Sequence, residues 1–341
     1  MSAAALERAE NLRLMGRFDD AERTLRDALG ASPDDPDLLG ELAWVLHLAD
    51  RPAEGLTAAD AATARAPQDG RLHQIRAALL SALSRHDEAV QAAFAARSLR
   101  PQDAGTARAH ARVLAAAGRL REAGDAARQA VALDPESSAA HFTLADISDD
   151  LGDRRTARRA YEEALRLDPQ NAVARHDLAV LDANTRHPVR ALRGLVEAGA
   201  LDPTLPLVMR TIAAVLWKLS WRLRMLFVVA TVACVAASGP EPDEPTWATR
   251  VAAAGALLVI GLLVWWTARD LPARTRPAVR AALRTDGPLR FTYLAIAACV
   301  LLFLTVAVTG LGVFAGFVWL VLGLLGVLAL AVRLVRRLRG T

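Results

Sequence analysis

The stretch AGTARAHARVLAAAGRLREAGDAARQAVALDPES, residues 104–137, is one unit of a pattern that recurs every 34 residues. Its marker is the proline near its end, and a proline stands at the same place in the units before and after it. The prolines of this series are Pro33, Pro67, Pro101, Pro135, Pro169 and Pro203. A fixed period of this length predicts a chain built from stacked, similar supersecondary units.

Alanine occupies three fixed places in each unit. The residues 24, 12 and 5 positions before each proline are alanine in 17 of 18 cases, and Gly55 is the exception. Because alanine carries only one methyl group, two helices that meet there can approach closely. Proline cannot continue a helix, so it indicates where the second helix of each unit ends. Gly16, Gly118 and Gly152 share one offset and predict a turn with positive φ between the two helices.

The pattern resembles the tetratricopeptide repeat, a 34-residue pair of helices. The resemblance covers six repeats, starting near residues 2, 36, 70, 104, 138 and 172, and implies an all-α superhelical solenoid of about 12 helices in residues 1–203. In that family the first helix of each pair lines a concave face, which binds an extended peptide or a helix of a partner protein. Carried over by offset, the groove candidates are Trp44, His47, Arg71, Gln74, Arg108, Arg112, Phe142, Asp146 and His176, with Glu10, Arg13, Asp149 and Val180 beside them.

Some members of the family hold a terminal carboxylate with lysine and asparagine in their first repeats. Here the matching positions are Leu6, Glu10, Gly40 and Trp44. The resemblance therefore implies that this clamp is absent, and an acidic chaperone tail is not the expected partner.

Arg108 and Arg112 lie four residues apart, on one face of the expected helix. Such a pair could hold a carboxylate or a phosphate. The alternative is that both are solvated, or paired with the acids Asp146, Asp149 and Asp150 of the next repeat. The sequence leaves both interpretations open.

Charge differs between the two parts of the chain. Residues 1–203 carry 26 arginines against 32 acids, whereas residues 204–341 carry 15 basic residues against 5 acids. The basic isoelectric point therefore describes the second part alone, and we expect no nucleic-acid partner for the repeats. A single lysine, Lys218, among 41 basic residues indicates a GC-rich coding genome and a bacterial source.

No motif of a catalytic or metal site is present. The seven histidines do not pair at helical spacing, and there is no HExxH, nucleophile elbow, Walker loop or dinucleotide fingerprint. Cys234 and Cys299 lie in apolar runs and are expected to act as small hydrophobic residues. The chain starts directly with the first repeat, without the pattern of a cleavable signal peptide. We expect no enzyme activity, no metal and no cofactor.

Residues 204–224 form an amphipathic helix pattern with two tryptophans. This helix is expected either to cap the open end of the solenoid or to lie in the membrane interface. The sequence does not decide between the two.

Four apolar runs follow, and we interpret residues 225–335 as a transmembrane region. The expected spans are about 223–238, 251–268, 291–309 and 313–332, which together predict a four-helix transmembrane bundle. The first run is short. Arginines cluster in the loop 269–290 and in the tail, while the loop 239–250 is acidic. Because arginine-rich flanks stay cytoplasmic, both termini are expected on the cytoplasmic side of a bacterial inner membrane.

The runs contain no ionisable residue except at their margins. Transporters place such residues near the midplane, so the bundle is expected to be an anchor. Gly312, Gly316 and Gly323 share one helical face and predict close packing against another span, with dimerisation through this face as the alternative.

The sequence thus predicts a membrane-anchored adaptor or scaffold that binds a partner protein in the concave face of its repeats. The alternative is a transporter or channel subunit with a regulatory repeat domain. A further alternative is that the arginine-rich loop senses anionic lipid, although a topology signal also explains the arginines there.

Overall fold

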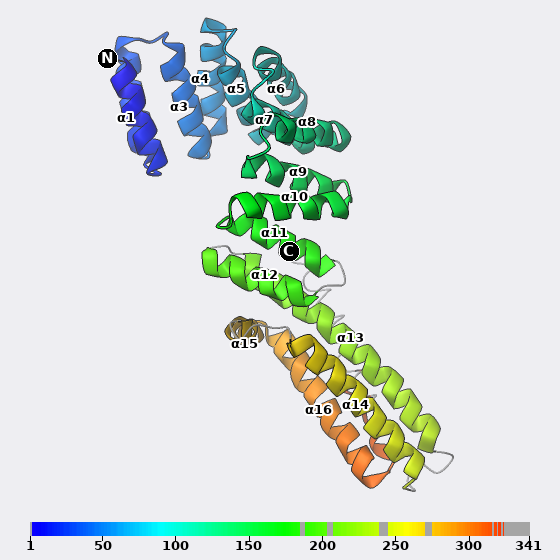
Figure 1. Ribbon diagram of the computed structural model, residues 1–341. Helices are drawn as coiled ribbons and strands as arrows, with labels where there is room; N and C mark the ends of the chain where they lie inside the picture. The colour runs from blue at the N-terminus through cyan, green and yellow to red at the C-terminus, as the bar shows by residue number, and fades with distance from the viewer. Residues whose placement is uncertain are drawn as a thin grey trace. The chain divides into compact units, whose positions relative to one another are not determined.

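The computed structural model describes residues 2–184, 188–202, 207–238, 245–269, 275–315, 317–318, 320–321 and 323. The chain divides into two compact units, Met1–Pro169 and Gln170–Thr341. Within the described residues every regular element is a helix, and Figure 1 shows them. The all-α fold class is therefore confirmed.

The N-terminal unit is a stack of helix pairs (Figure 1). The first helix of each pair has 13 residues and the second has 14. The pairs are α1 (Ser2–Leu14) with α2 (Phe18–Ala31), α3 (Pro36–Leu48) with α4 (Pro52–Arg65), α5 (Gly70–Ala82) with α6 (His86–Leu99), α7 (Ala104–Ala116) with α8 (Leu120–Leu133), and α9 (Ser138–Asp150) with α10 (Arg154–Leu167). This is the predicted helical solenoid, with the predicted starting points.

The alanines of the pattern lie where helices cross. All of them except Ala28 are at most 2 % exposed. Leucine, isoleucine and valine side chains such as Leu38, Leu79 and Leu80 fill the remaining space and are fully buried. Small residues at the crossings and large ones around them give the interlocking contacts that close helix packing requires.

Gly55, the exception in the alanine series, has a steric cause. A methyl group at this position of α4 would lie 2.8 Å from the Leu79 Cδ2 and 3.0 Å from the Ala43 carbonyl oxygen. Real Cβ atoms essentially never come as close as 2.8 Å to a neighbour, so alanine here would require the Leu79 side chain to move, and the 3.0 Å contact with the α3 backbone would also be tight.

A capping residue stands two positions after each proline from Pro33 to Pro169. The side chain there accepts a hydrogen bond from a backbone N–H in the first turn of the next helix. These caps are Asp35, Asp69, Asp103, Ser137 and Asn171. Proline thus prevents the first helix from continuing, and the side chain two residues later caps the next helix. The cap is needed because the first N–H groups of a helix have no partner within the helix.

The turn between the helices of a pair places one residue in the left-handed region. Gly16, Gly118 and Gly152 have φ of +72°, +75° and +78°, as their shared offset predicts. In the second and third repeats the same position holds Asp50 and Ser84, each with φ of +59°. A side chain in this conformation is strained by about 1–2 kcal/mol.

We therefore expect Ser84→Gly to stabilise the N-terminal unit. Glycine removes the strain, and its greater freedom in the unfolded chain offsets about 0.5–1 kcal/mol of that gain. The net expected increase in the free energy of unfolding is roughly 0.5–1 kcal/mol, measured by urea denaturation of the full chain. Ser81→Gly, three residues earlier inside α5, is the control and is expected to destabilise. If Ser84→Gly had the same effect as Ser81→Gly, strain at residue 84 would be excluded.

The C-terminal unit begins with a sixth helix pair, α11 (Ala172–Asn184) and α12 (Pro188–Leu201), again of 13 and 14 residues. The other helices described in this unit are α13 (Leu207–Ser238), α14 (Trp247–Arg269), α15 (Thr275–Thr285) and α16 (Gly287–Thr309). One core cluster joins Leu192 and Leu195 of α12 to Ile212 and Leu216 of α13. The first half of α13 therefore packs on the sixth pair.

The second half of α13 belongs to a different core cluster, with α14 and α16. The Phe227 and Phe303 rings lie 5.6 Å apart, and Cys234 and Cys299 are buried free thiols in the same cluster. The residue pattern predicts an amphipathic helix at residues 204–224 followed by a short span at about 223–238. The structure has one continuous helix instead, because no proline or glycine lies between Leu207 and Ser238.

The predicted four-helix transmembrane bundle needs correction. Among the described residues two helices are long and apolar enough to cross a membrane, at Val208–Ser238 and Gly287–Thr309. The apolar stretch Trp247–Leu262 of α14 is shorter, and the predicted span 313–332 falls mostly outside the described residues. The arginine-rich loop also contains a helix, α15, that was not predicted.

Two glycines follow each other closely at the end of α16: Gly310 ends the helix, and Gly312 is the first residue of the predicted glycine face. Gly310 has φ of +77° and caps α16, and a methyl group on it would lie 3.1 Å from the Thr246 carbonyl oxygen. Gly312 is buried, whereas Gly323 has open space around its Cα. Gly316 lies outside the described residues, so the shared packing face stays a prediction.

Candidate functional site

A groove lies along the first helices of the first four repeats. It has a volume of about 750 Å³ and takes side chains from α1, α3, α5 and α7. Its polar and aromatic lining is Glu10, Arg13, Glu41, Trp44, His47, Arg71, Gln74, Ser81, Arg100, Arg108 and Arg112. Six of the nine predicted groove candidates line this groove, namely Trp44, His47, Arg71, Gln74, Arg108 and Arg112. The first and last of them are 68 positions apart in the sequence.

The acids of the groove are neutralised at its N-terminal end. The Arg13 Nε donates to Glu41 Oε1 at 2.7 Å, and its Nη2 lies 3.4 Å from Glu10 Oε1. Glu41 was not among the predicted residues. It is buried beside α1 because Arg13 compensates its charge, which a single-repeat pattern does not reveal.

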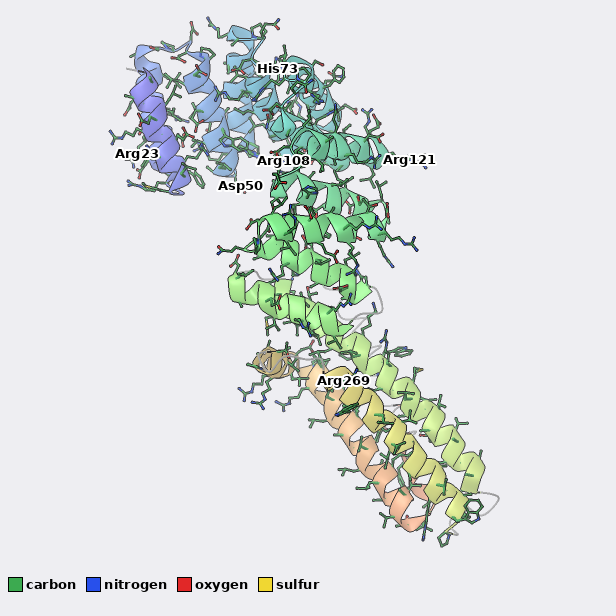
Figure 2. The ribbon with its side chains drawn as sticks, in the orientation of Figure 1. Arg23, Asp50, His73, Arg108, Arg121 and Arg269 are labelled. Carbon is green, nitrogen blue, oxygen red and sulfur yellow. The ribbon has the colours of Figure 1, made fainter. Side chains whose placement is uncertain are left out.

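Arg108 and Arg112 differ from the other arginines of the groove. In the part of the chain that the structure describes, neither forms an ion pair or a hydrogen bond, so the alternative of pairing with acids of the fifth repeat is not seen. Arg108 is half-buried and Arg112 is exposed. The pKa of Arg108 lies below its usual value because of burial and the like charge of Arg112. Figure 2 labels Arg108 on α7 and, projecting from the other side of the stack, Arg121 on α8.

Trp44 and His47 form an aromatic wall on α3. Their ring centroids lie 5.2 Å apart with the planes inclined by 34°. Burial lowers the pKa of His47, and the positive charge of Arg112 lowers it further. The His47 Nδ1 is buried and, among the described residues, has no hydrogen-bond partner. The imidazole is thus a neutral side chain with an unused polar atom at neutral pH.

Arg71 and Gln74 lie on α5, between the aromatic wall and the two free arginines in the order of the repeats. Arg71 Nη2 donates to Asp37 Oδ1 at 2.6 Å. Gln74 Oε1 accepts from the Thr106 hydroxyl at 3.3 Å, so its amide nitrogen is the part left to donate. Arg71 is therefore neutralised, and Gln74 is a neutral donor.

The remaining candidates do not line this groove. Phe142 stacks edge to face on Tyr161 at 5.9 Å, and the Tyr161 hydroxyl donates to Asp146 Oδ1 at 2.6 Å. Phe142 and Asp146 thus tie α9 to α10 inside the fifth repeat. His176 belongs to the C-terminal unit, where its ring nitrogens lie 2.9 Å from Asp177 Oδ1 and 3.3 Å from Thr211 Oγ1.

No arrangement for metal binding gathers in the residues that the structure describes, since no group of three His, Cys, Asp or Glu side chains comes together there. What the groove offers chemically is two cationic donors, a neutral amide donor and an aromatic wall.

Sequence profiles of the tetratricopeptide repeat family match residues 12–79 and 138–171. A comparison with curated protein sequences finds no similar one.

Solved structures show the same fold at low sequence identity. The crystal structure of the Cut9–Hcn1 hetero-tetramer of the APC/C contains a chain with a TM-score of 0.57 and 14 % identity, over 63 % of this chain and 43 % of that one. The present chain therefore spans less than half of that relative. Pseudomonas aeruginosa PilF has a TM-score of 0.50 and 19 % identity, over 59 % of this chain and 92 % of that one.

Proposed function

We propose that this chain, which contains tetratricopeptide repeats, is a scaffold that binds a partner protein in the groove of its N-terminal unit and is held at a membrane by its C-terminal helices. Tetratricopeptide repeats are protein-interaction modules, which supports partner binding. The observation that carries the proposal is the groove itself, in which Arg108 and Arg112 have no ion-pair or hydrogen-bond partner among the described residues. An interior surface with unused donors is what a peptide-binding groove needs.

The apolar faces of α13 and α16 support attachment to a bilayer. On α16 the side chains of Leu294, Leu301 and Val308 are 60 %, 63 % and 69 % exposed. The core helix of a water-soluble protein would bury such side chains, so exposure on this scale suits a lipid environment. The arginines near the ends of these helices favour the cytoplasmic side of a bacterial inner membrane for the repeats.

Site-specific photocrosslinking tests the proposal. A photoreactive phenylalanine analogue is placed at Ala82, which lines the groove, or at Arg121, which is exposed on α8. With the full chain in native membranes, irradiation should give a discrete protein adduct from position 82 and none from position 121. Adducts of equal intensity from both positions, or none from position 82, would contradict binding in the groove.

A further inference from the structure

The groove holds two positive charges that have no counter-ion among the residues that the structure describes. Arg13 pairs with Glu41 at 2.7 Å, Arg71 with Asp37 at 2.6 Å, and Arg100 with Asp103 at 2.8 Å. Arg108 and Arg112 are left over in a unit whose chain segment carries more acids than arginines. Their isolation is therefore not due to a shortage of acids nearby in the sequence.

The spacing of the two arginines keeps their charges together. Residues four apart on a helix have Cβ atoms about 5–6 Å from each other, and like charges at this spacing destabilise the helix by a few tenths of a kcal/mol. Both side chains line the same groove. An anion between them would remove the repulsion and accept several charge-assisted hydrogen bonds, because guanidinium donors match the two oxygens of a carboxylate.

The form of the groove favours a peptide over a small anion. Its volume of about 750 Å³ is far larger than one carboxylate or phosphate requires, and it extends over helices of four repeats. Ile75, Ala78 and Val113 give it apolar lining, and Trp44 gives it an aromatic wall. Gln74 also lines the groove, and its amide nitrogen, which the contact with Thr106 does not use, can donate to a carbonyl oxygen, a group that a peptide backbone offers at every residue.

We propose that this groove recognises an acidic segment of a partner protein, with one aspartate or glutamate carboxylate held between Arg108 and Arg112. The inference rests on the proposed function, and it specifies the chemistry of the partner. The site lies on the fourth repeat and is separate from the clamp positions of the first two repeats, where this chain has Leu6, Glu10, Gly40 and Trp44.

A peptide array with matched twins tests the proposal. The full chain in detergent micelles is applied to immobilised 12-residue peptides of varied apolar and acidic sequence, each accompanied by a twin in which glutamine and asparagine replace glutamate and aspartate. A charge-assisted hydrogen bond is worth about 1.5–3 kcal/mol. The bound acidic peptides are therefore expected to outbind their amide twins by roughly 10-fold to 100-fold.

Variants connect the preference to the arginines. Arg108→Gln with Arg112→Gln should reduce the preference for acidic peptides to roughly 3-fold or less. The control is Arg155→Gln with Arg159→Gln, which removes two exposed arginines at the same spacing on α10 and should leave the preference unchanged. If the double variant does not fold, Arg112→Gln alone replaces it, since Arg112 is exposed. This single variant should show a preference for acidic peptides between those of the unchanged chain and the double variant.

Each other outcome counts against the inference in a distinct way. Equal binding of acidic and amide twins would overturn it and leave groove binding, and thus the proposed function, intact. Absence of binding by every peptide would overturn it, while crosslinking at Ala82 would still decide the proposed function. Displacement of the acidic peptides by 1 mM inorganic phosphate would show a site for a small anion instead of a peptide.

Discussion

Leu79→Ala is expected to lower the free energy of unfolding of the N-terminal unit by about 2–5 kcal/mol. Leu79 is fully buried on α5, and its Cδ2 reaches the surface of α4 above Gly55. Alanine at this position would leave a cavity, because a helix stack held on both sides by neighbouring repeats cannot collapse into the space. Urea denaturation of the full chain, followed by limited proteolysis of the unfolded fraction, measures the loss.

A second variant, Gly55→Ala, tests whether Leu79 packs directly against α4. Gly55→Ala alone is expected to destabilise by about 1–3 kcal/mol, since its methyl group would collide with Leu79. In the double variant that methyl group enters the space that Leu79→Ala vacates. The double variant should therefore lose less unfolding free energy than the sum of the two single losses. In a double-mutant cycle the expected difference is about 1–2 kcal/mol.

Leu14→Ala provides the comparison at the surface. Leu14 is 71 % exposed at the end of α1, and its truncation should change stability by less than about 0.5 kcal/mol. Strictly additive losses at Gly55 and Leu79 would contradict the close contact between α4 and α5.

Leu301→Arg is expected to reduce the membrane insertion of α16 by roughly 100-fold. Leu301 is 63 % exposed within α16, and an arginine at the centre of a span costs about 2.5–3.5 kcal/mol of insertion free energy. A reporter enzyme that is active on one side of the membrane only, inserted after Leu311, measures the fraction of chains in which α16 crosses.

The control for this variant is Phe94→Arg. Phe94 is also 63 % exposed, but it lies on α6 of the helical repeats, where a charged side chain meets water. Its replacement should leave the reporter activity unchanged. Full reporter activity with Leu301→Arg would mean that residue 301 does not lie in the apolar core of a bilayer, and absence of activity in the unchanged chain would mean that α16 does not cross.

Local chemistry made the helical repeats predictable. Proline ends a helix wherever it falls in its interior, glycine accepts positive φ, and alanine allows close crossing, so each feature depends on the residue itself and its near neighbours. The caps from Asp35 to Asn171 were not predicted, although each lies two residues after a proline of the series. The predicted break within α13 coincides with a change of composition, which by itself does not interrupt a helical backbone.

The groove was predictable in part. The 34-residue period, together with what the resemblance to the tetratricopeptide repeat implies about the concave face, placed Trp44, His47, Arg71, Gln74, Arg108 and Arg112 along one line, since stacked repeats repeat their orientation. The same offset also suggested Phe142 and Asp146, which instead contact Tyr161 within their own repeat.

The sequence by itself determined the helix pairs, their lengths and their turns, because these depend on interactions within about one repeat. Only the tertiary structure decided which charges stay unpaired. Arg13 meets Glu41 across 28 residues, while Arg108 and Arg112 meet no acid among the described residues. Ion pairing depends on separations of a few ångströms between side chains of different helices, and a linear pattern of residue types does not contain those distances.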